Sequence, residues 1–494
     1  MNRWSEKKQK NRIKTQFGKN PMDMENWESL QLRMYEIEMY EQRRRKTFNQ
    51  EWVDDVTWND LEMDRVFARI NHTRTYMGEQ ILYHRLHGCK NRQKLQRMEK
   101  RIAFFSCQES SRIKVEEKLS HIGKQKENYY LPLFLMDEIN WPVTSCIGLY
   151  LQQVLLVICL AGTVLARSNV WGLGLLVVAT VNLLIYLHAK NKYEGNLFAV
   201  ANMKVALDFC NWMIKSFEGN QLYADEEILQ ALEKTRKLAK QMGRWQARKY
   251  QSVTGDLTGI VQDYLAGVTL YDIVAFCHIE KALRKCRKET LQLYEFVGDV
   301  DTDIAIASFR KSLTNWCSPM IQKSGSIRLE KICHPLMDDG VANSIELRKG
   351  AIFTGANASG KSTFMKAVAI NVILAQTIHT CVAKNVKMPT IKVMTSMALR
   401  DDVVQKESYY MREMKRMLDE IEKGEPVLFV IDEILKGTNT RERLGASKAI
   451  LSYMAQKPGF LLVATHDLEL VKAEEDLYET YYFDSQICGK DIIF

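Results

Sequence analysis

The sequence has no C-x-x-C pair and no group of histidines and cysteines at the spacing of metal ligands, although it contains 11 cysteines and nine histidines. The patterns of a structural zinc site and of a disulfide framework are therefore missing, which favours a reducing compartment. The basic residues among the first 20 positions are not followed by an apolar stretch, so they do not have the pattern of a secretory signal. We interpret them as a solvated basic tail.

Internal repeats and low-complexity segments are also missing, and the composition excludes a mainly disordered chain. The 494 residues are 46% hydrophobic and 26% charged, which predicts two to four domains. The 69 Lys and Arg against 60 Asp and Glu give a formal net charge of +9. This mild basic excess is compatible with nucleic acid or with anionic lipid and is specific for neither.

One segment, residues 143–189, departs sharply from the average composition. Residues 143–166 and 168–189 contain no Asp, Glu, Lys or Arg, and only Arg167 interrupts them. A bilayer core about 30 Å thick needs about 20 helical residues, so both runs can cross it. We predict a transmembrane helical hairpin in the cell membrane, with two helices and with both flanks on the side that Lys190 marks as cytoplasmic.

The alternative for this segment is a buried helical hairpin inside a soluble protein. Gln152, Gln153 and Asn182 are the best support for that alternative. These amides could equally form hydrogen bonds across the hairpin or to a second subunit, because an unpaired amide in lipid is costly.

The flanks of the hairpin are predicted to be helical, and the region after them has short apolar runs separated by helical stretches. We divide the chain into a basic N-terminal segment at 1–57, a helical core and lever region at 58–142 and 190–325 around the hairpin, and an α/β domain at 326–494. Within the second lever part, an amphipathic helix is expected from Asp225 to Gly243. The α/β domain contains short apolar runs that predict a mainly parallel sheet covered on both faces, at 351–354, 391–395, 427–431 and 460–464.

Residues 355–362 fit the pattern G-x-x-x-x-G-K-[ST]. They follow a predicted strand and precede a helical stretch, which is the context of a phosphate-binding loop. Its glycines let backbone N–H groups approach phosphate oxygens, and the helix N-terminus adds a favourable dipole. Lys361 is expected to reach the β and γ phosphates and Ser362 to ligate Mg²⁺, so ATP and Mg²⁺ are the expected cofactors.

Two acids and a histidine follow other predicted strands. The run 427–431 leads into Asp432 and Glu433. Asp432 is expected to hold Mg²⁺, and Glu433 to polarise the water that attacks the γ-phosphate. His466 follows the strand at 460–464, where an imidazole could sense the γ-phosphate. Without the phosphate loop, the acid pair could simply mark the end of a strand, and the histidine could be a structural residue.

Six sequence elements in this order resemble the ATPase domain of the MutS DNA mismatch-repair family, a branch of the ABC ATPases. The elements are His334-Pro335, Val341-Ala342-Asn343, residues 354–383, Ser408-Tyr409-Tyr410-Met411-Arg412-Glu413-Met414, Asp432-Glu433 with Gly437-Thr438-Asn439-Thr440, and Ala464-Thr465-His466. A weaker likeness in the helical regions extends the coverage to about 58–140 and 190–485. The resemblance implies an ABC-type P-loop ATPase domain and long helical levers.

The resemblance also implies a homodimer, joined through the ATPase domains, in which Ser408 completes the partner's nucleotide site in trans and Asn439 lies in a loop at the interface. Levers that grip double-stranded DNA follow from the same resemblance. The catalytic residues are expected to be Glu433, His466, Lys361 and Ser408. The ATP contacts are expected from Gly355, Asn357, Ser359, Gly360, Lys361, Ser362, Thr363, Val341 and Asn439, and the Mg²⁺ ligands from Ser362 and Asp432.

Four departures from the family pattern stand beside the resemblance. None of the 18 phenylalanines is followed two residues later by Glu, which argues against mismatch sensing in the family's usual way. Gly340 occupies a position where the family usually has an aromatic residue for adenine, so relaxed base specificity is expected. The chain ends earlier than the family pattern, which suggests a shortened C-terminus. The hairpin fits a membrane-bound branch.

The sequence therefore predicts a membrane-anchored, dimeric MutS-like ATPase that binds DNA and is related to mismatch repair. The alternative is a membrane ABC-type ATPase switch that acts on a protein or lipid partner without DNA. A scaffold that does not hydrolyse ATP is a third possibility, against which Lys361, Asp432 and Glu433 argue.

Overall fold

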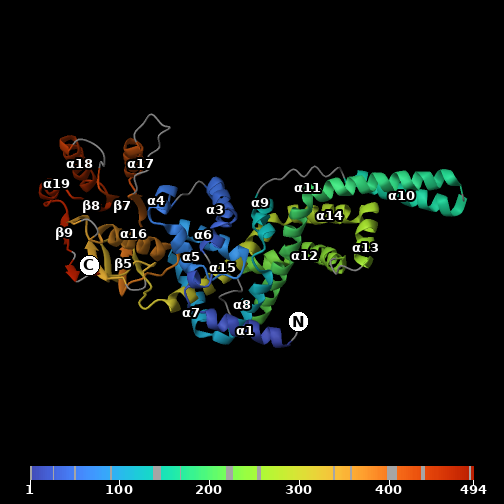
Figure 1. Cartoon of the computed structure of the whole chain (residues 1–494), viewed down its shortest axis with the longest axis horizontal. Coiled ribbons are helices and arrows are strands. Elements are labelled where there is room, and N and C mark those ends of the chain that lie inside the picture. Colours follow the sequence, from blue (N-terminus) through green and yellow to red (C-terminus); the bar gives the residue numbers. More distant parts are fainter. Residues whose placement is uncertain are drawn as a thin grey trace.

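The computed structural model describes most of the chain. The described residues are 3–25, 27–48, 52–89, 92–136, 146–166, 168–217, 226–252, 257–337, 340–356, 359–397, 409–434, 440–484, 486–488 and 491–493. The molecule is elongated, with the α/β part at one end, a helical body in the middle and a two-helix hairpin at the other end (Figure 1).

The helical part extends from the N-terminus to residue 312. Its first elements are α1 (Arg3–Gln16), η1 (Pro21–Asp23), α2 (Trp27–Gln31), α3 (Met34–Phe48), α4 (Asp55–Asp60), α5 (Met63–Ile70), α6 (Tyr76–His87), α7 (Arg92–Cys107), α8 (Glu109–Ile122), η2 (Lys126–Tyr130) and α9 (Leu131–Met136). They are followed by α10 (Cys146–Ala166), α11 (Asn169–Ser216), α12 (Glu226–Ser252), α13 (Leu257–Val268), α14 (Tyr271–Lys285) and α15 (Arg287–Ser312).

The α/β part follows α15. Its elements are β1 (Met320–Gln322), β2 (Ile327–Ile332), β3 (Asn343–Leu347), β4 (Gly350–Gly355), α16 (Lys361–Thr377), β5 (Asn385–Pro389), β6 (Lys392–Ser396), α17 (Tyr409–Glu422), β7 (Val427–Asp432), α18 (Thr440–Ala455), β8 (Gly459–Ala464), α19 (Leu468–Ala473), β9 (Glu479–Phe483), β10 (Gln486–Cys488) and β11 (Asp491–Ile493). The chain is thus mixed α/β and mostly helical. The predicted strand runs correspond to β4, β6, β7 and β8.

The larger sheet is parallel and has the strand order β6-β7-β8-β4-β9. Alternate residues of its strands face opposite layers. Phe353, Leu428 and Leu462 belong to the cluster that contains α16, whereas Ile352, Phe429 and Leu461 pack with α17, α18 and α19. Burial on both faces explains why these strands are continuous apolar runs. The smaller sheet has the order β1-β5-β2-β3.

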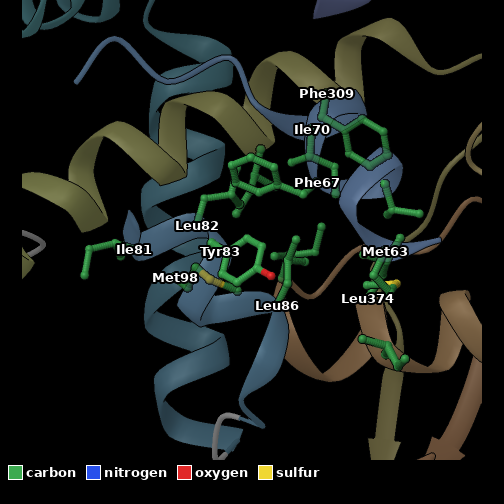
Figure 2. Packing of buried hydrophobic residues seen from close by; sticks show 14 of the residues in the cluster. Met63, Phe67, Ile70, Ile81, Leu82, Tyr83, Leu86, Met98, Phe309 and Leu374 are labelled. Carbon is green, nitrogen blue, oxygen red and sulfur yellow. The ribbon is translucent and has the colours of Figure 1, made fainter. Parts of the chain in front are cut away.

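One hydrophobic cluster connects the helical body with the α/β part. It includes Met63 of α5, Leu86 of α6 and Leu374 of α16, which lie in one group in Figure 2. Nearly every side chain of α16 is buried, because this helix contacts both sheets as well as α6. The helix that begins at Lys361 is therefore packed directly against the body that carries the hairpin.

The basic N-terminal segment is not a solvated tail, and that interpretation is wrong. Residues 3–16 form α1, whose Ile13 is 3% exposed, and the following Phe17 is 7% exposed. The Phe17 ring lies against the Arg112 guanidinium, with 3.4 Å between the ring centroid and Cζ. The sequence pattern is misleading because the basic side chains surround a narrow apolar stripe.

The hairpin consists of α10 and the first half of α11. Residues 147–166 and 169–189 are long and apolar enough to cross a membrane, and only 11% and 17% of their most apolar windows are buried in the protein. Helix α11 continues to Ser216 without a break, so the boundary expected at 189/190 lies inside one helix. Helix α12 likewise runs through Gly243 to Ser252, beyond its predicted end.

Candidate nucleotide site

The predicted site residues gather at the carboxyl ends of β4, β7 and β8. Strand β8 lies between the other two and pairs in parallel with both. Asp432 is in register with Ala464, two residues before His466. Because parallel strands end at one edge of a sheet, the acid pair, the histidine and the glycine-rich loop share that edge.

The loop between β4 and α16 has the backbone that its glycines permit. Gly355 has φ +139°, and a Cβ there would come within 2.2 Å of the Phe483 carbonyl oxygen. Gly360 has φ +85° and caps the N-terminus of α16. Both positions need glycine, because other residues are strained at these angles.

Lys361 folds back over this loop. Its ammonium donates hydrogen bonds to the Gly355 and Ala356 carbonyl oxygens at 2.9 and 2.6 Å, and to Ser359 Oγ at 3.2 Å. Burial lowers the pKa of Lys361, and the nearby Asp432 and Glu433 carboxylates oppose that shift. The loop thus holds a cation over the N-terminus of α16, where an anionic ligand is favoured.

Ser362 and Asp432 form a pair of oxygen donors suited to Mg²⁺. The Ser362 hydroxyl donates a hydrogen bond to Asp432 Oδ2 at 2.7 Å, from the first turn of α16 to the end of β7. A hydroxyl and a carboxylate are hard oxygen ligands, and Mg²⁺ commonly uses one or two such groups together with substrate phosphates. The donor set therefore fits the cation that the sequence suggests.

Glu433 and His466 meet across β7 and β8. His466 Nε2 lies 3.3 Å from Glu433 Oε1, and both side chains are partly exposed. Glu433 has φ +61°, an unusual value for a residue other than glycine, and its N–H donates to the Ala464 carbonyl at 2.9 Å. The turn therefore places the carboxylate beside His466 at the end of β8.

The remaining predicted residues divide into two groups. Thr363 is exposed on the first turn of α16, and Val341, 55% exposed, precedes β3 on the smaller sheet. Asn357, Ser408 and Asn439 lie outside the described residues. The structure therefore brings together Lys361, Ser362, Asp432, Glu433 and His466 in one place.

A set of contacts that sequence reasoning missed ties α4 to the edge of this domain. Arg416 of α17 donates to Asp54 Oδ2 at 2.6 Å and to the Thr395 carbonyl. Asp60 accepts from the Thr395 hydroxyl at 2.8 Å and from the Met397 N–H at 2.9 Å. Asp54 and Asp60 are more than 330 positions from their partners in the α/β part, so no local sequence signal identifies these contacts.

A second missed contact lies beside His466. Arg443 of α18 donates two hydrogen bonds to the Asp467 carboxylate, at 2.9 and 3.1 Å. A bidentate pair of this kind fixes orientation as well as distance. It holds the loop after β8, and therefore His466, against the first turns of α18.

Comparison with known proteins finds similarity in the part of the chain that contains this site. The family MutS domain V matches residues 351–493. Among similar proteins, each named DNA mismatch repair protein MutS, that of Chlamydia pneumoniae is 29% identical over 204 residues, and that of Fusobacterium nucleatum subsp. nucleatum is 33% identical over 218 residues. The two matches cover 38% and 41% of this chain, and 24% of each relative.

The chain spans about a quarter of the length of the relatives it matches. The matched family region begins in β4 and includes the loop, the acid pair and His466. Residues 351–493 therefore match MutS domain V, and through this region the chain is similar to proteins of the MutS family.

Proposed function

We propose that the protein is a membrane-anchored ATPase that hydrolyses ATP to ADP and phosphate at the edge formed by β4, β7 and β8. The observation that supports this most strongly is the convergence of Lys361, the Ser362–Asp432 pair at 2.7 Å and the Glu433–His466 pair at 3.3 Å. A phosphate cradle, a metal-binding pair and a general base are the parts that ATP hydrolysis needs.

Each side chain has a defined part in the proposed reaction. Lys361 exchanges its loop carbonyls for the β and γ phosphates. Ser362 and Asp432 would hold Mg²⁺, which would supply positive charge to neutralise those phosphates. Glu433 takes a proton from water as the water oxygen attacks the γ-phosphorus and the bond to the β-phosphate oxygen breaks. His466 orients the Glu433 carboxylate and contacts the γ-phosphate.

The proposed active unit is a dimer of ABC-type P-loop domains. Ser408 from one subunit then completes the nucleotide site of the other, with Asn439 at the interface. The domains at 58–142, 190–325 and 326–494 act together, because α16 is packed against α6 in the shared core. Closure of the dimer on ATP moves the helical body and the hairpin at 143–189 with it.

The preferred partner of the helical body is double-stranded DNA. Helix α12 presents an exposed basic stripe of Arg236, Lys237, Lys240 and Arg244, at spacings that place these side chains on one face. A row of this kind suits phosphates, which dominate affinity for a duplex. The relatives are named DNA mismatch repair proteins, so the proposed role is related to DNA mismatch repair.

One observation favours the alternative, an ATPase switch on a protein or lipid partner without DNA. The hairpin forms the end of the molecule farthest from the site (Figure 1). It exposes large apolar side chains, such as Leu165 at 83% and Val170 at 75%. An apolar end cannot grip a phosphate backbone.

Turnover of the detergent-solubilised protein with and without duplex DNA tests the proposal. We expect Mg²⁺-dependent hydrolysis, and tenfold stimulation by DNA would correspond to about 1.4 kcal/mol. Binding across a salt series gives a steep negative slope if α12 contacts phosphates, at about −0.9 per phosphate. Replacing Arg236, Lys237, Lys240 and Arg244 by Gln flattens that slope.

The matched control replaces Lys323 and Lys387, exposed on the smaller sheet, by Gln and leaves the slope unchanged. Turnover without any duplex binding at low salt would establish the alternative. Absence of hydrolysis with and without DNA would remove the ATPase proposal.

A further inference from the structure

The base of the hairpin is fastened to the turn between α13 and α14. Gln153 Nε2 of α10 donates to the Thr269 carbonyl at 2.8 Å, and Asn182 Nδ2 of α11 donates to the Val268 carbonyl at 2.9 Å. At the same junction, a small apolar cluster joins α10, α11 and α14 through Leu149, Tyr186, Leu270 and Cys277. Two amides of the hairpin thus donate to the carbonyls at the end of α13.

These bonds lie inside the apolar length of the hairpin. Gln153 precedes Ala166, the last residue of α10, by about 13 residues, and Asn182 follows Asn169, the first residue of α11, by the same interval. At about 1.5 Å per residue, the end of α13 is only about 20 Å from the hairpin tip. A hydrocarbon layer about 30 Å thick therefore reaches past the end of α13 by about 10 Å.

Helix α13 has an exposed apolar face at this level. Val261, Tyr264 and Leu265 are 55%, 62% and 58% exposed, and their spacing of i, i+3 and i+4 places them on one side. Ala266, 2% exposed, faces the protein, and a Cβ on Gly267 would come within 2.9 Å of the Tyr186 ring. Figure 1 shows α13 lying across the direction in which the hairpin extends.

We propose that α13 is an interfacial membrane helix that lies in the plane of the cytoplasmic leaflet and sets the depth of the hairpin. Its occupant is lipid, because α13 packs against the hairpin helix α11 and its exposed apolar face lies at the level that the bilayer must reach. A helix of this kind buries its apolar side about 5–10 Å into the boundary of headgroups and acyl chains, which agrees with the estimated overlap. Tyr264 suits that boundary, since its ring is apolar and its hydroxyl is polar.

The proposal rests on the membrane anchor proposed above and adds a third contact with the bilayer. It also gives the hairpin amides a role. By capping the end of α13, Gln153 and Asn182 hold this helix at a fixed height along the hairpin. Motion of the ATPase domains would then reach the membrane surface through a rigid unit of α11, α13 and α14.

Depth-dependent quenching in proteoliposomes tests the position of α13. In separate full-length proteins, dansylalanine replaces Tyr264, Leu265, Leu176 in the middle of the α11 span, or Leu32, which is 82% exposed on the helical body. The vesicles contain phosphatidylcholine and phosphatidylglycerol, with a nitroxide at acyl carbon 5 or carbon 12. ATP turnover of each labelled protein verifies that it is folded.

We expect the probes at positions 264 and 265 to be quenched at least about twofold more by the shallow nitroxide than by the deep one. The probe at 176 should be quenched more strongly by the deep nitroxide, and the probe at 32 by neither. Quenching at 176 without quenching at 264 and 265 would overturn the interfacial helix and leave the anchor intact. The same result is expected if a second copy of the chain, instead of lipid, covers α13. No quenching at 176, 264 or 265 would overturn both the helix and the anchor.

Discussion

Lys361 and Glu433 are close in space, yet the proposed reaction gives them separate chemical tasks. The lysine ammonium donates to three oxygens of the loop, and Asp432 and Glu433 favour its charged form although burial lowers its pKa. Glu433 instead projects from a left-handed turn toward His466. Binding and hydrolysis should therefore respond to different substitutions.

We predict that Lys361→Ala weakens ATP binding about 10- to 100-fold, because a charge-assisted hydrogen bond contributes about 1.5–3 kcal/mol. Glu433→Gln should retain binding, stabilise the ATP-bound dimer and lower turnover about 100-fold or more, since a general base contributes at least that factor. Nucleotide titration, sedimentation and single-turnover hydrolysis measure the three quantities. Glu425→Gln, an equal charge change at an exposed position before β7, is the control. Unchanged turnover in the Glu433 variant would exclude Glu433 as the base.

The protonation of His87 provides a test of how the helical body is packed. The ring is 4% exposed, stacks on Trp58 with 3.6 Å between the ring centroids, and hydrogen-bonds through Nδ1 to the Tyr83 carbonyl. Burial lowers the pKa of His87 to about 4, from an ordinary value of about 6.5. The folded protein therefore keeps this imidazole neutral in a pH range where the unfolded chain binds a proton.

Between about pH 6.5 and 4 the unfolded state thus binds the extra proton, so the free energy of unfolding falls as the pH falls. The slope for one group is up to about 1.4 kcal/mol per pH unit. We predict that His87→Gln lowers stability overall and makes the slope less steep by up to that amount, measured by denaturant titration of the solubilised protein at several pH values. His121→Gln, on the exposed face of α8, is the control, and an equal change of slope in both variants would contradict the assignment.

At the level of elements, α4 connects the helical body with the edge of the larger sheet. Asp54 caps α4 by accepting from the Thr57 N–H at 2.7 Å and also accepts from Arg416 of α17 at 2.6 Å. Helix α17 begins directly after Ser408, the residue proposed to complete the partner's nucleotide site, so movement at the proposed dimer interface would reach α4 through this ion pair.

We predict that Asp54→Asn lowers ATP turnover about fivefold or more with little change in ATP affinity, because the amide retains the helix cap but loses the charge. Steady-state turnover and nucleotide titration separate the two effects. Asp55→Asn is a close control, since Asp55 is the next residue and pairs with Arg45 at 2.7 Å while remaining 79% exposed. The coupling role is wrong if the two variants have equal turnover.

Elements buried on both faces could be predicted from the sequence, and elements that depend on distant partners could not. The runs at β4, β7 and β8 contain almost only apolar residues, because both layers of helices cover them. Helix α1 is not recognisable in the sequence because basic residues surround the buried Ile13, and because Phe17, which follows the helix, packs against the distant Arg112. Helix α12 passes Gly243 because tertiary packing overrides the local preference.

The same distinction applies to the candidate site. A local pattern identifies Lys361 and Ser362, since the loop chemistry is encoded in eight consecutive residues. The pairing of Arg443 with Asp467 depends on how α18 packs beside the loop after β8, and neither residue has a distinctive neighbourhood in the sequence. Contacts between elements can therefore be identified only when the fold is known.

For the whole molecule, the long helix α11 determines how the hairpin and the body move. Its 48 residues make it about 70 Å long, and it extends without a break from the hairpin tip into the helical body. In the proposed ATPase, a rigid rod of this length would transmit a small rotation at the ATPase domains to the membrane. The proposed anchor is thus a continuous part of the proposed lever and is not a flexible tether.

The anchor leads to a prediction about the full-length chain. Val157 and Val177 lie near the middle of the two apolar spans and are 63% and 53% exposed. A charged side chain at the centre of a membrane helix costs about 2.5–3.5 kcal/mol. Replacing both valines by Glu, or deleting residues 143–189, should therefore release the protein from membranes, as measured by sedimentation after an alkaline wash.

Release of the deletion variant alone could result from damage at the base of the hairpin, because the deletion also removes Asn182 and Tyr186, which pack against α13 and α14. The double glutamate variant retains those contacts and differs from the native chain only on the exposed surface. Leu32→Glu, an equal change far from the hairpin, should remain in the membrane fraction. If both glutamates are tolerated and the protein stays with the membranes, the exposed faces of α10 and α11 do not contact lipid, and the hairpin is covered by protein instead.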